Sequence, residues 1–203
     1  MKLVFMLFVL VVIAPAALSR AVQYDFGVYL DGKRIGEHTF VVEPTTGGGY
    51  TVQSDARFEV KVLMVPLYRY RHTAHEVWEG GCLQSISSST MVNGRESALR
   101  GSLQADGFAL EVEEAGAVES RSLPGCVATF AYWDAATLQQ QERLLNSQTG
   151  AYEPVTFNRE SAGRVAINSE KFVINLEYAA DQWRGLSTLR DGRRLEYRFE
   201  SPV

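Results

Sequence analysis

Histidine and acidic side chains are the residues of this sequence whose types could support catalysis or metal binding. His72, His75 and Glu76 fall within one short stretch, and His38 is the remaining histidine. On a strand, residues three apart face opposite sides, so His72 and His75 cannot share one ion without a bulge. We therefore expect one of these two histidines to face inward and the other outward, and we assign no metal site, cofactor or catalytic residue.

The same stretch carries an aromatic face. With a period of two, Tyr68, Tyr70, His72, Glu76 and Trp78 share one side of a strand. Aromatic rings with polar tips suit the wall of a ligand pocket, so these residues are ligand-binding candidates. The alternative is an ordinary amphipathic strand packed on a helix. An acid–base pair of His72 and Glu76 is a further alternative, in which neighbouring groups would shift both pKa values.

Strands must position these residues, because strand and turn signals dominate the chain. Alternation of apolar and polar residues is clean over Val22–Leu30 and Thr51–Val62. Pairs of Asp-Gly or Asn-Gly that begin at residues 31, 93, 106 and 191 predict two-residue hairpin turns, and Gly47–Gly49 predicts another reversal. Further strands are expected at residues 35–42, 66–78, 86–92, 98–103, 108–112, 152–157, 164–167, 171–178, 186–189 and 195–199.

The predicted fold class is all-β: a single antiparallel meander of about ten strands with one helix. A sheet of that width curls into a barrel or half-barrel, which commonly holds one apolar ligand. The helix is expected over Ala135–Leu145, capped by Asp134, with Leu138, Leu144 and Leu145 on its apolar face. We expect it at an end of the barrel or in the concave face.

The N-terminus reads as a secretory signal peptide over residues 1–21. Lys2 precedes the apolar run Leu3–Ile13, and small residues follow, so cleavage is expected between about Ala16 and Ala21. The run is too short to span a bilayer, which takes about 20 apolar residues, although an N-terminal anchor is the alternative. We therefore predict a periplasmic or secreted protein with a single domain over residues 22–203.

Charge argues against two classes of partner. The chain has 20 basic and 24 acidic residues; removing Lys2 and Arg20 with the signal leaves 18 against 24, a formal charge of −6. A mildly acidic chain without a Lys/Arg cluster does not favour nucleic acid. The same lack of a polybasic stretch disfavours stable attachment to an anionic membrane.

Two cysteines, Cys82 and Cys126, remain in the exported chain. An oxidising compartment makes a disulfide between them the expected state. The alternative is two free thiols, but neither cysteine lies in a Cys-x-x-Cys motif or beside basic residues that would lower its pKa.

A second aromatic cluster, Phe130–Trp133, follows Cys126 and leads into the predicted helix. The simplest interpretation is that this cluster anchors the predicted helix on the sheet. If the disulfide forms, Tyr132 and Trp133 would approach Trp78 and form one aromatic wall. Tyr132 and Trp133 are therefore ligand-binding candidates as well.

Several short segments resemble a family of uncharacterised bacterial exported proteins, a domain of unknown function. They are Tyr24–Phe26, Leu30–Lys33, Ile35–Gly36, Glu76–Trp78, Gly81–Leu83, Gly125–Cys126, Phe130–Trp133, Leu145–Gly150, Gly192–Arg193, Leu195 and Tyr197. The resemblance implies the architecture, export and the cysteine pair, and it implies no activity. More distantly the chain is similar to lipoprotein-carrier-like and lipocalin-like β proteins, a likeness at the level of fold.

Three functions follow as hypotheses. The first is a non-enzymatic periplasmic carrier for an apolar or amphipathic, lipid-like ligand. The second is a protein-interaction module in cell-envelope assembly without a small-molecule pocket, which a packed interior would favour. The third is an enzyme that acts on envelope lipids through His72 or Glu76.

Overall fold

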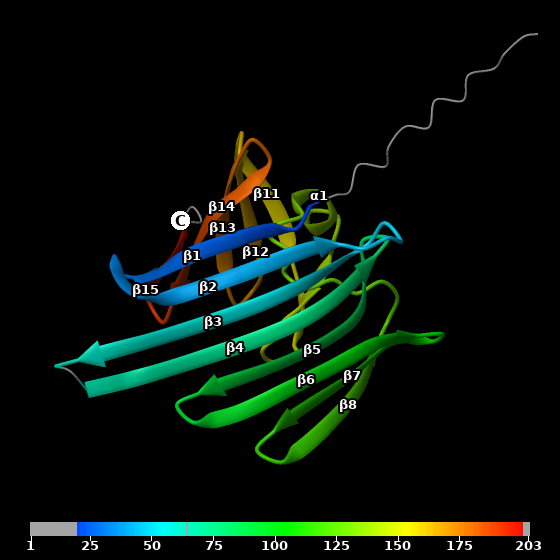
Figure 1. Ribbon diagram of the computed structural model, residues 1–203, viewed down its shortest axis with the longest axis horizontal. Coiled ribbons are helices and arrows are strands. Elements are labelled where there is room, and N and C mark those ends of the chain that lie inside the picture. The colour runs from blue at the N-terminus through cyan, green and yellow to red at the C-terminus, as the bar shows by residue number, and fades with distance from the viewer. Residues whose placement is uncertain (1–19, 64, 201–203) are drawn as a thin grey trace, which may run out of the picture.

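The computed structural model describes residues 20–63 and 65–200 and consists mainly of antiparallel strands (Figure 1). The all-β class predicted from the sequence is confirmed. In chain order the elements are β1 Val22–Leu30, β2 Lys33–Pro44, β3 Tyr50–Val62, β4 Val65–Glu79, β5 Cys82–Val92, β6 Arg95–Gln104, β7 Gly107–Glu114, β8 Ala117–Leu123, α1 Ala135–Leu138, β9 Arg143–Leu145, β10 Tyr152–Pro154, β11 Thr156–Ser161, β12 Arg164–Asn168, β13 Val173–Ala179, β14 Gln182–Arg190 and β15 Arg193–Glu200.

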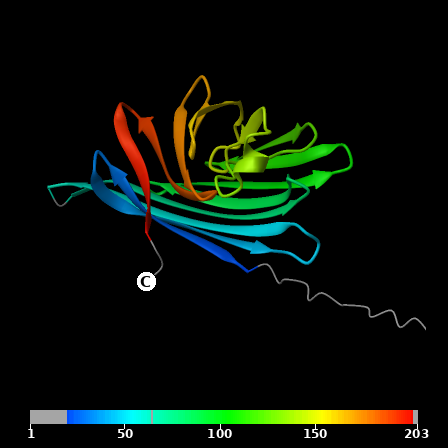
Figure 2. The ribbon, with the colours of Figure 1, turned by 90° about the horizontal axis from the view of Figure 1, so that it is seen from above.

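Two meanders form one large sheet. Strands β1–β8 follow one another in space, as do β11–β15, and pairing of β15 with β1 joins the two sets. In the described chain β8 and β11 are the two edges, so the sheet curls strongly without closing (Figure 2).

This sheet has 13 strands, more than the ten or so expected. One reason is β8, whose Ala117–Leu123 sequence is largely polar and lacks the alternation that marks a strand. The predicted strand over residues 152–157 is divided at Val155: β11 belongs to this sheet, whereas β10 pairs with β9 in a separate two-stranded sheet.

Three of the four predicted hairpin turns lie where the sequence places them. Asp31–Gly32, Asn93–Gly94 and Asp191–Gly192 all have positive φ angles, between 49° and 84°. Both central residues of such a turn need this left-handed conformation, which Asp, Asn and Gly tolerate best. The fourth turn is displaced by one residue: Ala105–Asp106 form it, and Gly107 begins β7.

Residues 124–155, which we call the covering segment, run across the concave side of the sheet (Figure 2). The predicted helix is much shorter than expected. Asp134 does cap α1, accepting a hydrogen bond from Thr137 N at 3.0 Å, but the helix ends at Leu138. Leu144 instead belongs to β9, which pairs with β10. Short helices depend on tertiary packing for stability, and here strand pairing buries the same leucines.

The hydrophobic core lies between the concave face and the covering segment. The sheet contributes Phe26, Trp78, Phe108 and Trp183, all fully buried. The covering segment contributes three leucines that are at most 1 % exposed, Leu138, Leu144 and Leu145. The chain therefore fills its own half-barrel.

Candidate functional site

Strand β4 presents the predicted aromatic face to the concave side. Tyr70, His72, Glu76 and Trp78 are buried, with exposed fractions of 7 %, 3 %, 5 % and 1 %. Tyr68, nearer the end of the strand, is 36 % exposed. The expected alternation is confirmed, but the covering segment lies against this face, and the role of these side chains in ligand binding stays a prediction.

The two inward-facing histidines lie in one row across the sheet. His38 on β2 and His72 on β4 both pair in register with Ala56 on β3. The small Ala56 side chain leaves room for the two imidazoles on either side of it. His75 is exposed on the opposite face of β4, as expected.

Hydroxyl groups surround both imidazoles. The two ring nitrogens of His38 lie 3.2 Å from Tyr197 Oη and 2.7 Å from Ser54 Oγ. Those of His72 lie 2.9 Å from Thr90 Oγ1 and 3.4 Å from Ser147 Oγ in the covering segment. A hydroxyl can both donate and accept, so neutral imidazoles satisfy these partners.

Burial keeps both histidines neutral. It lowers the pKa of His38 from 6.5 to about 3, with a further contribution from the charge that His72 would carry. It lowers the pKa of His72 to about 4, against a smaller opposing effect of Asp55. Each imidazole therefore resists protonation as long as the fold is intact.

Glu76 is the buried carboxyl of the site. Its Oε2 accepts hydrogen bonds from Trp78 Nε1 at 2.9 Å and from Thr129 Oγ1 of the covering segment at 3.0 Å. Burial raises the pKa of Glu76 from 4.5 to about 7, and these two hydrogen bonds act in the opposite direction. Among the described residues His72 and Glu76 form no hydrogen bond with each other, and each has its own partners.

Replacing Glu76 with glutamine is expected to change how stability depends on pH. Since the folded pKa of Glu76 lies above its unfolded value, the folded protein loses stability as the pH rises from 4.5 through 7. We expect the stability difference between Glu76→Gln and the wild type to shift by about 3 kcal/mol between pH 5 and pH 9, in favour of the variant at high pH.

Urea unfolding at both pH values measures this difference. Glu79→Gln, an exposed position at the end of the same strand, is the matched control and should give a curve parallel to the wild type. A parallel curve for Glu76→Gln itself would contradict the prediction.

The two predicted aromatic clusters meet in one core. The rings of Trp78 and Tyr50 stack at 5.7 Å, Trp133 lies 5.7 Å from Phe40, and Tyr132 lies 5.1 Å from Trp183. Trp78, Tyr132 and Trp133 are thus on the same side of the sheet, as predicted. They pack against other side chains of the protein.

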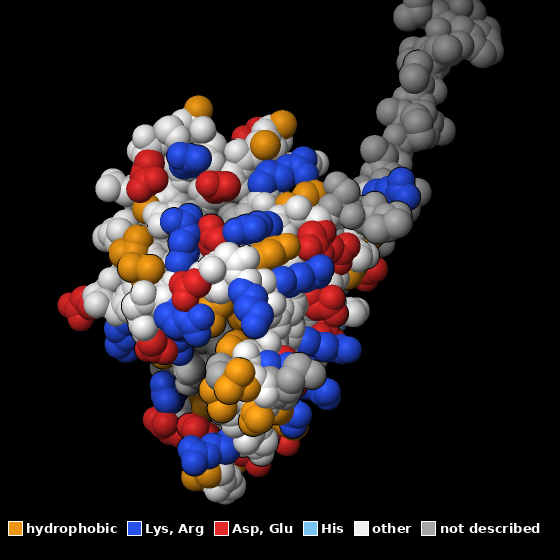
Figure 3. All heavy atoms as spheres, turned by 90° about the vertical axis from the view of Figure 1, so that its left-hand side faces the viewer, with side chains coloured by type: hydrophobic (Ala, Val, Ile, Leu, Met, Phe, Trp, Pro, Cys, Tyr) orange, Lys and Arg blue, Asp and Glu red, His pale blue; other side chains and the backbone are white. Residues whose placement is uncertain are grey.

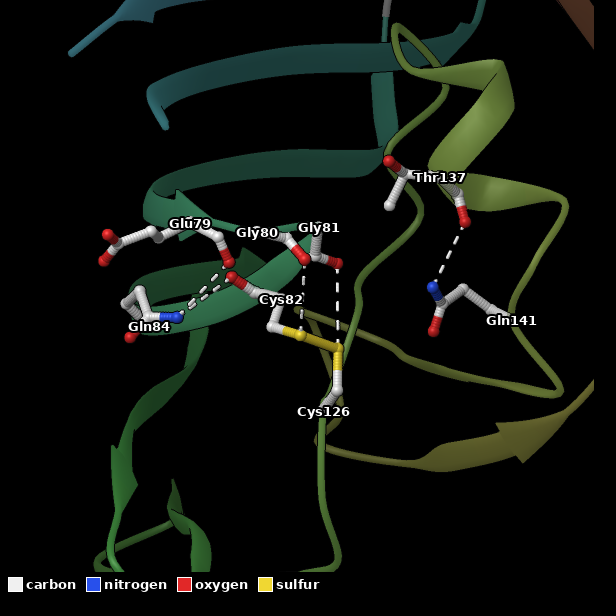
Figure 4. The surroundings of a disulfide bond; sticks show 8 residues. All are labelled: Glu79, Gly80, Gly81, Cys82, Gln84, Cys126, Thr137 and Gln141. Carbon is white, nitrogen blue, oxygen red and sulfur yellow. Dashed lines mark hydrogen bonds between the residues drawn. A yellow bond between two sulfur atoms is a disulfide. The ribbon is translucent and has the colours of Figure 1, made fainter. Parts of the chain in front are cut away.

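A disulfide links the covering segment to the sheet (Figure 4). Cys82, the first residue of β5, bonds to Cys126, with the two Cα atoms 5.1 Å apart. Beside the bond, Leu83 N donates to the carbonyl oxygen of Val127 at 2.8 Å. The predicted pairing of the two cysteines is confirmed, and it fits a secreted or periplasmic protein.

Two surface features escaped the sequence analysis. An open depression of about 680 Å³ lies on the side of the sheet away from the covering segment, lined mainly by polar residues of β2–β6 such as Gln53, Thr73 and Ser87. The turn between β3 and β4 exposes large apolar side chains, Leu63 above all. The sequence did carry a signal for the second feature: the bend before Pro66 lacks Gly, Asn and Asp and lies among apolar residues.

Fold and site together define a class: a curled, β-barrel-like protein whose concave face is closed by its own chain. The chain belongs to a family described as domain of unknown function DUF6134, whose model matches residues 26–200. The resemblance to an uncharacterised family is thereby confirmed. No curated protein matches the chain.

A solved structure shares the fold. It is the crystal structure of a β-barrel-like protein of domain of unknown function DUF1849 from Brucella abortus, with a TM-score of 0.61 and 12 % sequence identity. The match covers 88 % of this chain and 95 % of that one. At this identity the likeness concerns the fold alone.

The described residues bear on the predictions about export and membranes as follows. The predicted signal peptide lies almost wholly outside the described residues, and the single domain over residues 22–203 stays a prediction. Among the described residues, no helix has the length and apolar character that a membrane crossing requires.

Proposed function

We propose that this protein is a non-enzymatic binding module of the cell envelope that meets its partner with its outer surface. The observation that supports this proposal is the covering segment, which packs on the concave face where a carrier would hold a ligand. Trp78 and Leu83 on the sheet and Leu144 on the segment are at most 1 % exposed. A partner therefore reaches the protein at exposed side chains or at a sheet edge.

Catalysis at the buried polar groups receives little support. His72 and Glu76 are both at most 5 % exposed, and their hydrogen bonds go to residues of the fold. A general acid or base must come within hydrogen-bond reach of a substrate. In the described arrangement both groups hold the covering segment against the sheet.

Native mass spectrometry of the mature protein, purified from an oxidising compartment and followed by solvent extraction, tests the proposal. We expect the mass of the mature chain less two hydrogens for the disulfide, with no bound molecule. The same preparation, unfolded in urea and refolded, is the control and should give the same mass. A lipid that co-purifies in a fixed ratio would overturn the proposal in favour of a carrier.

The carrier for an apolar or amphipathic ligand is the second candidate, and one observation favours it. The contact between sheet and covering segment is partly polar: Ser88 Oγ donates to the carbonyl oxygen of Ser147 at 2.6 Å, and Thr129 donates to Glu76. A ligand that displaced the segment would meet Tyr70, His72 and Trp78. Trp fluorescence distinguishes the two candidates. Adding a fatty acid should change the emission of a carrier, because the ligand would meet Trp78, and should leave the emission of a closed module unchanged.

A further inference from the structure

The β3–β4 hairpin extends beyond the strands beside it and points to the left in Figure 1. Strand β2 pairs with β3 only as far as Phe58, and β5 pairs with β4 only from Tyr70. Beyond these positions the ladder consists of β3 and β4 alone. The end of the hairpin therefore projects beyond the strands on either side of it.

Apolar side chains cover the end of this projection. Leu63 is 92 % exposed, Leu67 61 %, Val65 58 % and Tyr68 36 %. We call these four residues the hairpin tip. Figure 3 views the molecule from the side to which the hairpin points, and apolar side chains gather in its lower half. Scattered single apolar residues are common on surfaces, whereas a cluster marks a contact site.

The turn at the tip differs from its neighbours at the same end of the sheet. Those turns carry Asp31–Gly32, Asn93–Gly94, Ala115–Gly116 and Asp191–Gly192, small or polar residues that suit a left-handed backbone. The β3–β4 turn instead places Leu63 at a φ of +49°. A bulky residue in this conformation is strained, so the apolar side chain is kept at a cost in stability.

Cationic side chains flank the tip on both faces of the hairpin. Lys61 and Arg69 share the carboxylate of Glu59, at 2.7 Å and 3.1 Å. Arg190, at the end of β14, lies near Tyr68. Burial raises the pKa of the Tyr68 hydroxyl; the charge of Arg190 acts in the opposite direction, and that of Asp191 acts in the same direction as burial. Three cations thus face two carboxylates, an excess of positive charge on a chain whose net charge is −4.

We infer that the hairpin tip inserts reversibly into the surface of an anionic lipid bilayer, with Lys61, Arg69 and Arg190 at the level of the headgroups. This inference rests on the proposed function, because it names the partner of the outer surface. A convex tip of four side chains offers little area to a protein partner, whose interface typically buries about 800 Å² per side. A lipid bilayer is deformable, so unlike a protein partner it can accommodate a small projecting tip without a complementary surface. Tyr68 and the long cationic side chains suit the boundary between apolar and wet layers.

Binding of the oxidised mature chain to vesicles tests the inference. We expect co-sedimentation with vesicles of phosphatidylglycerol and phosphatidylcholine, and weaker binding to phosphatidylcholine alone or at high salt. The triple variant Leu63→Ser/Val65→Ser/Leu67→Ser should lower the partition coefficient by about tenfold or more.

Matched apolar positions elsewhere provide the control. Leu103, Val118 and Val173 are 39 %, 61 % and 47 % exposed and lie outside the hairpin. Leu103→Ser/Val118→Ser/Val173→Ser should leave the partition coefficient within about twofold of the wild type, since these side chains do not meet the lipid. Equal losses in the two triple variants overturn the inference.

A second measurement does not depend on removing the tip. Leu63→Trp adds an exposed indole, whereas Trp78 and Trp183 are at most 1 % exposed and Trp133 is partly buried against the core, so the wild-type emission in the same vesicles is the reference. Brominated lipids should quench the added emission when the variant binds vesicles. Binding without quenching overturns the inference, because another part of the surface then contacts the lipid.

The two proposals fail in different ways. If the purified chain has the mass of the mature protein alone but binds no vesicle, the lipid inference is overturned and the outer-surface module stands. If a lipid co-purifies inside the protein in a fixed ratio, the proposed function itself is overturned, whatever the vesicles show.

Discussion

The double variant His38→Gln/His72→Gln is expected to lose much less stability in acid than the wild type. Both imidazoles are buried and neutral, and burial lowers the pKa of His38 to about 3 and that of His72 to about 4. Unfolded histidines bind a proton near pH 6.5, so the wild type loses stability as the pH falls from 6.5 through these folded values. His72 alone accounts for about 3 kcal/mol of this loss.

Urea unfolding at pH 7, 5.5, 4.5 and 3.5 measures the effect. The stability difference between the double variant and the wild type should shift by more than about 3 kcal/mol toward the variant over this range. Glu76 takes up its proton in the same pH range, which adds stability to both the wild type and the double variant. This contribution is the same in both proteins, so it drops out of the stability difference between them.

Glutamine keeps groups that can donate and accept at both positions, so the hydroxyl partners of the imidazoles stay satisfied. The exposed His75→Gln on the opposite face is the matched control, with a curve parallel to the wild type expected. The prediction is wrong if the double variant follows the wild type in parallel down to pH 3.5.

Removing the disulfide is the second change with a large expected effect. Cys82→Ser/Cys126→Ser should lower the free energy of unfolding by about 4 kcal/mol, because the bond closes a loop with a sequence separation of 44 and restricts the unfolded chain. Urea unfolding of the oxidised wild type and the double serine variant measures the difference. The wild type unfolded in reductant should fall to the value of the variant.

Hydrogen exchange measures which part of the protein is destabilised when the disulfide is removed. The Leu83 amide, which donates to Val127 in the covering segment, should exchange faster in the double serine variant. Amides of the β12–β13 pair, such as that of Leu176, are not held by the bond and serve as the internal reference. Equal stability of the oxidised wild type and the variant would mean that the bond does not constrain the unfolded chain as expected.

Local chemistry was enough to predict most of the strands of the large sheet and most of their turns, although β8 lacks the alternating pattern. The alternation along β4 placed Tyr70, His72, Glu76 and Trp78 on one face, since the period of two is a property of the extended backbone. The turns at Asp31–Gly32 and its equivalents follow from the few residue types that tolerate positive φ. The cysteine pair followed from composition and compartment.

Long-range contacts decided the rest. Only the paired strands show that His38 and His72 flank Ala56, because the register of a hairpin depends on its turn and on any bulge, and the bulge between Val60 and Lys61 shifts the pairing of β3 with β4. Packing also turned the end of the predicted helix into β9, where Leu144 is buried.

The sequence by itself determined an all-β chain with an aromatic, partly ionisable inner face and one disulfide. Only the tertiary structure decided that residues 124–155 cover this face and that Leu63 stands exposed at a projecting tip. The physical reason is that burial depends on what lies opposite a side chain. A pattern of apolar residues records which side is apolar, and it cannot record whether a neighbour, a ligand or solvent covers that side.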